Sequence, residues 1–441
     1  MTLLPLVAHA DAARLATLGG GTDADALTAV TPIIDDVARE GDAAVLRAAA
    51  RFGEAPKGAL RVEPAAFAAA RRAVGRDVRQ ALERAARDIR KFARLQAAQL
   101  ADLDVAAGGA RVGHRVLALE RAGVYVPAGK HPLPSTALMG VIPARVAGVR
   151  EVVVCSPPTL DGDIHPAVLV AAELAGADAV FRVGGAQAVA AMAAGTATIP
   201  RVDKVVGPGN RFVAAAKSLV ALRGWCGIDV LAGPSELGCV VDGSVAPELA
   251  AGELLAQAEH DPAARLWLLA TSDAARDAVL AALPAALDAL PSPNRDDARA
   301  SLARGAAVTC PDLAAAAALA NRLGPEHLSL LIRRPAQALR RFTAYGSAFL
   351  GPFTPVAMGD YGVGPNHTLP TGGAARFASG LSVFSFVRWA THVELSAHAF
   401  ARLGPGVEAL AALEGLHAHA RTVRLRVDPE RPRTRSSRRS R

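Results

Sequence analysis

The sequence is poor in cysteine and in aromatic residues. Only 4 of its 441 residues are Cys, and Phe, Trp and Tyr together make up 4%. The cysteines form no C-x-x-C pair, so the sequence predicts neither a thiolate metal cage nor a redox-active dithiol. Cys155, Cys239 and Cys310 lie in or beside apolar runs typical of strands, where a buried, inert thiol is the ordinary interpretation.

The chain also lacks a long uninterrupted apolar run and a recognisable secretory leader. The least charged long stretch, residues 183–200, contains three glycines and Gln187, whose polar groups would be poorly satisfied in lipid. The apolar run at the N-terminus follows no Lys or Arg and is about half as long as a secretory hydrophobic region. We therefore expect no membrane span and a cytoplasmic protein.

The positive charge of the chain is concentrated at one end. The formal net charge is +8, and residues 428–441 carry six Arg against two acidic residues. This segment lacks aromatic residues and apolar periodicity, so we expect a disordered basic tail over residues 428–441. Because the rest of the chain is nearly balanced, its charge does not favour a nucleic-acid partner, and any contact with anions rests on the tail alone.

The order of apolar runs predicts an α/β fold. Helical spacing covers residues 64–101, with Gly75 as a break. Short β-rich runs then alternate with alanine-rich helical runs over residues 123–231, and the same alternation returns over residues 237–350. This is typical of parallel, doubly wound sheets, and the length is too great for one ordinary core. We expect two tandem Rossmann-like units, a Gly- and Pro-rich functional loop after Gly351, and a helical segment over residues 391–420.

Two turns could bind a dinucleotide, although no G-x-G-x-x-G motif follows a strand. One is Gly-Pro-Gly-Asn at residues 207–210, and the other is Gly-Gly-Ala-Gln at residues 184–187. Each directly precedes a helical run, so each offers backbone N–H groups and a positive helix end to a pyrophosphate. The sequence does not choose between them.

Polar pairs near helix ends are candidates for a metal and for acid–base chemistry. Gln257 and His260 lie three residues apart on one helical face, and Pro262 ends the helix. An ordinary surface pair is the alternative interpretation. Glu326 and His327 stand at a helix-to-strand junction, where a carboxylate and an imidazole can divide acid and base work. A polar cap on that turn is the alternative.

Two further segments carry possible ligands. A glycine-rich loop contains Asp360, a hard oxygen donor, and His367, which can donate or accept a hydrogen bond. A solvated Asp in a plain loop is the alternative interpretation. Near the end of the chain Glu414 precedes His417 and His419, which point the same way only in an extended segment.

Taken together and in this order, these motifs resemble the histidinol dehydrogenase family. The similarity covers residues 20–427. The matching stretches are Gly123-Val-Tyr-Val-Pro, Val183-Gly-Gly-Ala-Gln, Asp203-Lys-Val-Val-Gly-Pro-Gly-Asn, Ala232-Gly-Pro-Ser-Glu, Gln257-Ala-Glu-His, Gly324-Pro-Glu-His, Gly359-Asp-Tyr, Asn366-His-Thr-Leu-Pro-Thr-Gly-Gly and Ala375-Arg-Phe-Ala-Ser-Gly-Leu-Ser.

The resemblance implies oxidation of L-histidinol through L-histidinaldehyde to L-histidine with two NAD. It implies one zinc ion per site that positions the substrate, in an intertwined homodimer with shared active sites. The implied zinc ligands are Gln257, His260, Asp360 and, from the partner chain, His419.

The resemblance also implies roles for other residues. His327 would be the base of both oxidations, and Glu326 would activate the water that adds to the aldehyde. Besides His327 and the zinc ligands, the implied substrate contacts are Ser235, His367 and, from the partner chain, Glu414. The implied NAD contacts are Tyr125, Gln187 and Asn210.

The implied domain organisation has five parts. They are an N-terminal helical arm (1–23), an α/β domain with the metal and catalytic residues (24–122 plus 237–376), an NAD-binding α/β domain (123–236), a C-terminal helical domain that reaches the partner chain (377–427) and the basic tail (428–441).

The sequence departs from the family pattern at two places. Val356 stands where the family usually carries Glu, four residues before the expected metal ligand Asp360, and Lys130 and His131 replace small polar residues. These departures leave open a paralogous zinc- and NAD-dependent dehydrogenase of another small polar alcohol, such as a sulfonated propanediol. A zinc hydrolase that uses Glu326 to activate water is a third hypothesis, and it predicts activity without NAD.

Overall fold

The computed structural model describes residues 3–16, 23–128, 131–231 and 233–427. The chain divides into two compact units: residues 1–98 with 118–387, and residues 99–117 with 388–441. Lys130 and the basic tail lie outside the described residues. No helix in the described ranges is both long and apolar enough to cross a membrane.

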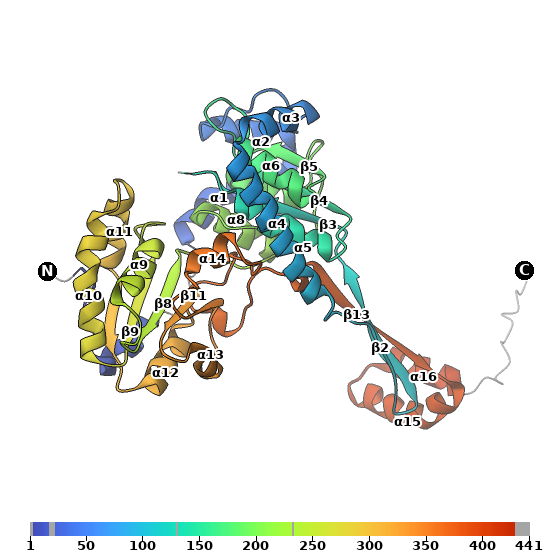
Figure 1. Cartoon of the computed structure of the whole chain (residues 1–441). Helices are drawn as coiled ribbons and strands as arrows, with labels where there is room; N and C mark the ends of the chain where they lie inside the picture. The colour runs from blue at the N-terminus through green and yellow to red at the C-terminus, as the bar shows by residue number, and fades with distance from the viewer. Residues whose placement is uncertain (1–2, 17–22, 129–130, 232, 428–441) are drawn as a thin grey trace, which may run out of the picture. The chain divides into compact units, whose positions relative to one another are not determined.

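The first sheet of the first unit contains five parallel strands in the order β5-β4-β3-β6-β7 (Figure 1). Its central runs are almost wholly apolar because both faces are covered. Val152 and Val154 face one core, and Val153 and Cys155 face the other. The strands are β3 (Arg121–Tyr125), β4 (Glu151–Ser156), β5 (Ala179–Arg182), β6 (Lys204–Val206) and β7 (Gly227–Ile228).

Helices from two parts of the chain cover this sheet. The crossover helices are α5 (Pro134–Val146), α6 (Pro166–Ala175), α7 (Gly185–Ala194) and α8 (Arg211–Leu222). The N-terminal helices are α1 (Ala24–Glu40), α2 (Asp42–Arg51), α3 (Pro64–Ala73) and α4 (Arg76–Ala97). Apolar residues of α3 and α4 pack with α5 and α6 on one face, and those of α1 and α2 pack with α7 and α8 on the other.

These N-terminal helices cover a different sheet from the one we expected. We expected residues 24–122 to belong with the metal and catalytic domain, whereas α1 to α4 complete the core of the sheet expected to bind NAD. Helical periodicity shows that a face will be buried, but not against which sheet. The break expected at Gly75 is confirmed, since it separates α3 from α4.

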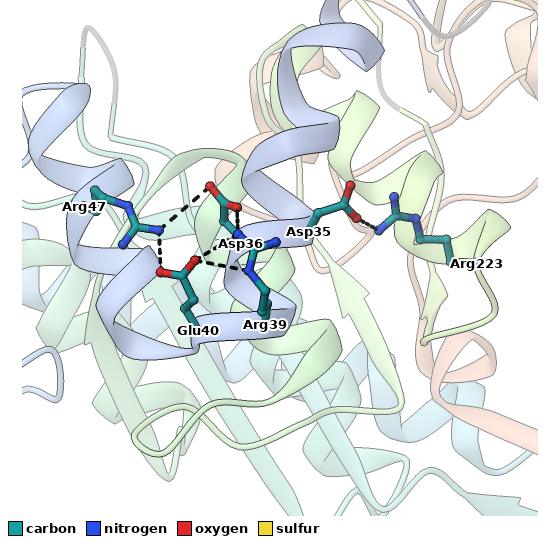
Figure 2. Close-up of polar contacts among 6 residues, drawn as sticks. All are labelled: Asp35, Asp36, Arg39, Glu40, Arg47 and Arg223. Atoms are coloured by element: carbon teal, nitrogen blue, oxygen red, sulfur yellow. Dashed lines mark hydrogen bonds and ion pairs between the residues drawn. The ribbon is translucent and has the colours of Figure 1, made fainter.

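The outer face of α1 carries a set of ion pairs with α2 and with the residue after α8 (Figure 2). Glu40 binds Arg39 at 2.9 Å and Arg47 at 2.8 Å, and Asp35 binds Arg223 at 2.5 Å. Exposed pairs of this kind contribute about 0–1 kcal/mol each. The apolar face of α1 therefore fixes its position.

The second sheet repeats the topology of the first, with five parallel strands in the order β10-β9-β8-β11-β12. This confirms the expected mixed α/β architecture with two similar parallel sheets. The strands are β8 (Glu236–Val241), β9 (Arg265–Ala270), β10 (Ala306–Thr309), β11 (His327–Leu331) and β12 (Ser347–Leu350).

Helices again cover both faces of the second sheet. One face packs against α9 (Pro247–Ala258), α10 (Asp273–Asp288) and α11 (Asn294–Leu302). The other packs against α12 (Leu313–Leu323), α13 (Pro335–Ala338) and the 3-10 helix η1 (His9–Leu15). The N-terminal segment also joins this sheet, because Leu6 forms a parallel bridge with Ala307.

The segment after β12 is rich in loops, as expected. It contains the short helix α14 (Val356–Tyr361) and two short 3-10 helices, η3 (Ala374–Arg376) and η4 (Val383–Phe386). A third 3-10 helix, η2 (Leu339–Arg341), precedes β12. Leu381 and Phe386 enter the core of the first sheet. The segment thus runs from the second sheet to the first within one unit.

The second unit contains a three-stranded sheet in the order β1-β2-β13 and a pair of helices. Its elements are β1 (Leu103–Ala107), β2 (Ala110–Ala118), β13 (Val387–Leu395), α15 (Ala397–Leu413) and α16 (His417–Val427). The predicted helix over residues 391–420 is wrong for 391–395, which pair as a strand. Thr391 and Val393 favour a strand, and a neighbouring strand was needed to decide it.

Candidate functional site

Glu326 and His327 stand at the amino end of β11. Helix α12 ends at Gly324 in the left-handed conformation, and three residues later the chain enters the strand at His327. Glycine is the residue that adopts this turn without steric cost. Both side chains are buried, with 7% of Glu326 and 4% of His327 exposed. A polar cap on a solvated turn does not fit such burial.

The main chain of Glu236, the first residue of β8, holds both side chains. Its N–H donates to Glu326 Oε2 at 2.9 Å, and its carbonyl lies 3.1 Å from His327 Nδ1. A carbonyl only accepts, so the neutral imidazole carries its proton on Nδ1 and leaves the lone pair on Nε2. Nε2 is buried and has no hydrogen-bond partner in the described part of the chain. His327 is therefore oriented as a base.

Burial shifts the pKa values of this pair in opposite directions. It lowers the pKa of His327 to about 4, with the same direction from His260 and His367, against the hydrogen bond to the Glu236 carbonyl. Burial raises the pKa of Glu326 well above its usual range, opposed by the N–H of Glu236 and reinforced by the Glu236 and Asp360 carboxylates. His327 is thus neutral at pH 7, and Glu326 is a stronger base than an exposed carboxylate.

Two of the expected metal ligands, His260 and Asp360, lie near this pair. Gln257 lies in the last turn of α9, which ends at Ala258, so His260 follows the helix and does not share a helical face with Gln257 as expected. Asp360 lies on α14. His260 acts electrostatically on His327 and His367, and the His367 ring bonds to the backbone of Asp360. The structure therefore gathers residues from α9, β11 and the loop after β12, which are far apart in the sequence.

The donor groups of Gln257, His260 and Asp360 fit a metal of the zinc type. None of them makes a side-chain hydrogen bond in the described ranges. Burial lowers the pKa of His260, which keeps a nitrogen lone pair available, and raises that of Asp360 to about 6 in the absence of a cation. Nitrogen and oxygen donors without thiolate suit a zinc that also takes substrate.

No group of three or more His, Cys, Asp or Glu side chains in the described residues is arranged to hold a metal ion. Only His260 and Asp360 of the expected ligands are of these types and belong to the first unit. Gln257 is an amide. The first unit therefore holds three of the four expected ligands.

A loop over residues 366–373 is hydrogen-bonded to the start of β8, next to the Glu326–His327 pair. Gly372 N–H donates to Glu236 Oε1 at 3.0 Å, and Gly233 N–H donates to Thr371 Oγ1 at 2.6 Å. Ser235, which is half-buried, lies between these two anchors at the start of β8. Burial raises the pKa of Glu236 to about 7. Sequence reasoning quoted Glu236 within a motif but gave it no role.

The same loop reaches the helices of the first sheet. Asn366 Nδ2 donates to the Met139 carbonyl on α5 at 2.8 Å, and His367 Nε2 lies 3.4 Å from Thr136 Oγ1. Burial lowers the pKa of His367 to about 4, so this ring is neutral beside the His327 site. The loop therefore joins the two sheets of the first unit.

Glu414 and His419 belong to the second unit. Glu414 follows α15, His419 lies in the first turn of α16, and both are exposed. Because this segment is helical rather than extended, His417 and His419 do not share a face. The two expected contacts from a partner chain are thus surface residues of a separate compact unit.

The expected NAD contacts meet at the carboxyl edge of the first sheet. Tyr125 ends β3, and its hydroxyl accepts from Gly185 N–H at 3.2 Å at the start of α7, where Gln187 is buried. Asn210 caps α8, and its Oδ1 accepts from Phe212 N–H at 3.0 Å and Val213 N–H at 3.1 Å. Burial raises the pKa of Tyr125 to about 12.

A buried ion pair that sequence reasoning missed fixes the loop before α8. Lys217 and Asp229 bind each other with 2% of each side chain exposed. Lys217 Nζ also donates to the Gly207 carbonyl at 2.9 Å, and Asp229 Oδ2 accepts from Gly207 N–H at 2.7 Å. A single Lys in the apolar run of α8 was the available signal, because an unpaired buried charge is costly.

Position 356 is part of the core rather than of the site. Val356 is buried among the apolar residues between the second sheet and α9, and its N–H donates to Glu253 Oε2 at 3.0 Å. Glu253 lies one turn before Gln257 on α9 and acts electrostatically on Asp360. A carboxylate therefore still lies beside position 356, supplied by another element.

A family model and the sequence relatives named here agree with each other. The family model described as "Histidinol dehydrogenase" matches residues 20–427. A histidinol dehydrogenase of Parasynechococcus marenigrum (strain WH8102) is 44% identical over 399 residues, which cover 90% of each chain. A histidinol dehydrogenase of Xylella fastidiosa (strain Temecula1 / ATCC 700964) is 46% identical over 400 residues, covering 90% of this chain and 92% of the relative.

A solved structure agrees with the sequence relatives. The crystal structure of histidinol dehydrogenase from Elizabethkingia anophelis superposes with a TM-score of 0.91 at 33% identity. The match covers 97% of this chain and 99% of the other.

Proposed function

The chain belongs to the histidinol dehydrogenase family, and from that premise we propose that it oxidises L-histidinol to L-histidine in two NAD-linked steps at the Glu326–His327 site. The family is NAD-dependent, and histidinol as substrate follows from membership. The alternative of a paralogue acting on another small polar alcohol finds no support in the relatives. A hydrolase that works without NAD does not fit the family either.

The observation that carries the mechanism is the orientation of His327. Its Nδ1 proton is directed to the Glu236 carbonyl, so the buried Nε2 lone pair is left for substrate. In the first step Nε2 removes the proton from the substrate hydroxyl while hydride leaves the same carbon for NAD. The low pKa of His327 keeps the ring free to accept this proton at neutral pH.

The second step needs a base for water, and Glu326 is placed for it. Its carboxylate is held by the Glu236 N–H beside His327, and burial raises its proton affinity. Glu326 removes a proton from the water that adds to the bound aldehyde. His327 gives up its first proton to solvent before it takes the hydroxyl proton of the resulting hydrate, as the second hydride leaves for the second NAD. The burial of both residues favours retention of the aldehyde between the two steps.

We assign Gln257, His260, Asp360 and His419 of the partner subunit as the holders of one zinc ion per site. When bound, zinc positions the substrate's nitrogen atoms. Ser235, His367 and Glu414 of the partner subunit add contacts to the substrate. Tyr125, Gln187 and Asn210 are assigned to NAD because they line the carboxyl edge of the first sheet.

The test of this function is NADH production from limiting L-histidinol, before and after chelation. We expect two NADH per histidinol, loss of activity on chelation, and recovery when zinc is returned. One NADH per histidinol would contradict the two-step reaction. Full activity after verified removal of the metal would contradict the zinc assignment alone.

We further propose a homodimer with shared sites. It is supported by the resemblance, which implies that Glu414 and His419 come from the partner chain, and by the exposure of both residues in the second unit. Chains with Glu326→Gln and chains with His419→Asn should each be inactive and should regain activity when refolded together. No recovery in a confirmed mixed dimer would place each site within one chain. The expected cytoplasmic location stays a proposal.

A further inference from the structure

The carboxyl edge of the first sheet contains a carboxylate that the proposed mechanism does not use. Strands β4 and β5 extend the sheet on one side of β3, and β6 and β7 extend it on the other. In open parallel sheets, ligands bind outside the carboxyl ends where the strand order reverses. Here that point lies between β3 and β6, next to Tyr125 and Gly207. A Cβ atom on Gly207 would lie 2.1 Å from the Tyr125 carbonyl oxygen, so the backbones are in contact there.

Glu54 lies at the same edge of the sheet, on the β4–β5 side of β3, although it comes from the loop after α2. Its Oε2 accepts from Gly184 N–H at 3.0 Å and from Gln187 Nε2 at 3.3 Å. A Cβ atom on Gly184 would meet Glu54 Oε1 at 2.5 Å and Pro157 Cβ at 2.6 Å. Gly184 follows β5 and Pro157 follows β4, so the carboxylate sits at the carboxyl ends of both strands.

Glu54 also distinguishes the two turns that the sequence left open. At α7 its carboxylate already binds the Gly184 N–H, and this negative charge offsets the positive helix end. At α8 the cap is the neutral amide of Asn210. An anionic pyrophosphate is therefore favoured at residues 207–210 and disfavoured at residues 184–187.

The chain after β4 contains no competing carboxylate. It continues as Pro157 and Pro158, and the next acidic residue, Asp161, accepts a hydrogen bond from Thr159 Oγ1. Within the described ranges Glu54 has no ion pair with Lys, Arg or His, and burial raises its pKa. Both hydrogen bonds that it makes in the described ranges go to Oε2, so Oε1 remains to accept one from a ligand, and the ionised group repels anions.

We propose that Glu54 determines the dinucleotide specificity of this enzyme. Its carboxylate accepts hydrogen bonds from the hydroxyls of the adenosine ribose and excludes a 2′-phosphate, so NAD binds and NADP is rejected. An acidic residue has this role in many dinucleotide sites, where it usually follows a strand of the sheet. Here a residue from outside the sheet supplies it. The inference rests on the proposed function, because it takes the first sheet as the NAD site.

The experiment compares NAD and NADP in the full-length wild type and in Glu54→Gln. The amide keeps the size and an oxygen acceptor for Gly184 N–H but removes the charge. We expect kcat/KM with NAD to fall about 10-fold and kcat/KM with NADP to rise about 10-fold, from the worth of hydrogen bonds to charged groups. Glu63→Gln is the matched control, since Glu63 is exposed in the same segment and makes no capping hydrogen bond. It should match the wild type.

Direct binding of NAD and NADP, measured by calorimetry without histidinol, separates this inference from the proposed function. A wild type that binds NAD but does not oxidise histidinol would contradict the proposed function. The effect of Glu54→Gln on the ratio of NAD to NADP affinity could still be measured in that case. An active wild type whose NAD-to-NADP ratio is unchanged in Glu54→Gln would overturn the assignment of Glu54. If Glu54→Gln does not fold, Glu54→Asp serves: it should still reject NADP, and equal use of both dinucleotides would overturn the proposal.

Discussion

The two parallel sheets of the first unit have the same strand order but place their polar residues at opposite edges. In the first sheet, Tyr125, the 207–210 turn and Glu54 lie at the carboxyl ends of the strands. In the second sheet, Glu236 and His327 are the first residues of β8 and β11, at the amino ends. Topology therefore does not fix which edge is functional. The edge that receives buried polar groups is set by the segments that fold over it.

The catalytic role of the amino edge of the second sheet can be tested by removing the proposed base. We predict that His327→Ala lowers kcat with histidinol about 100- to 10,000-fold, the usual worth of a general base. Steady-state rates at saturating histidinol and NAD measure this. Ser329→Ala is the control, because Ser329 is a buried residue two positions along the same strand and should leave the rate near that of the wild type. A loss below 10-fold in His327→Ala would remove His327 from the chemistry.

The role of the carboxyl edge of the first sheet can be tested by disrupting its buried ion pair. We predict that Lys217→Met lowers the free energy of unfolding by about 3–5 kcal/mol, because it leaves Asp229 charged and unpaired. It should also raise the KM for NAD, since the Gly207 carbonyl loses its hydrogen bond from Lys217. Urea unfolding and NAD titration measure the two effects.

The control for this pair lies at the end of the same helix. Arg223 pairs with Asp35 with 26% and 47% of the side chains exposed, so Arg223→Met should cost about 1 kcal/mol or less. The double variant Lys217→Met/Asp229→Asn should recover part of the stability. Equal costs for Lys217→Met and Arg223→Met would show that the buried pair does not anchor the loop.

The stability of the amino edge of the second sheet should depend on pH, because Glu236 is a buried carboxylate at that edge. Burial raises its pKa from 4.5 to about 7. The folded state therefore keeps a proton that the unfolded state loses, and this contribution to stability is present below pH 4.5 and lost as the pH rises to 7. Relative to Glu236→Gln, the wild type should lose up to about 3 kcal/mol over this range.

Urea unfolding at a series of pH values measures this difference. Glu248→Gln, which changes an exposed acidic residue in the first turn of α9, is the control and should follow the wild type. A wild type and a Glu236→Gln variant with parallel pH profiles would contradict the assigned cause.

The smallest expected effect concerns position 356. We predict that Val356→Glu, which restores the usual family residue, destabilises this chain by about 2 kcal/mol, because it places a second carboxylate against Glu253 in a buried position. Thermal unfolding measures the change. Adding Glu253→Gln to Val356→Glu should recover stability, whereas a Val356→Glu variant as stable as the wild type would show that the site accepts both carboxylates.

Some of this protein is determined by the sequence alone. The alternation of apolar runs determines two parallel α/β sheets, since a strand buried on both faces must be apolar throughout. Gly324 determines where α12 ends, because glycine adopts the left-handed turn at low cost. Pro262 only limits α9, which ends four residues before it at Ala258. The motif order indicates the family, and the expected residues Glu326, His327, His260, Asp360 and His367 lie around one site.

Only the tertiary structure decided the rest. It placed α1 to α4 on the first sheet, paired residues 391–395 as a strand, and brought Glu54 to Gln187, 133 positions along the chain. It also gave Glu236 its role through main-chain atoms, which every residue possesses and no side-chain pattern reveals. Sequence patterns report local conformation and burial, whereas contacts between distant segments depend on how complete elements pack.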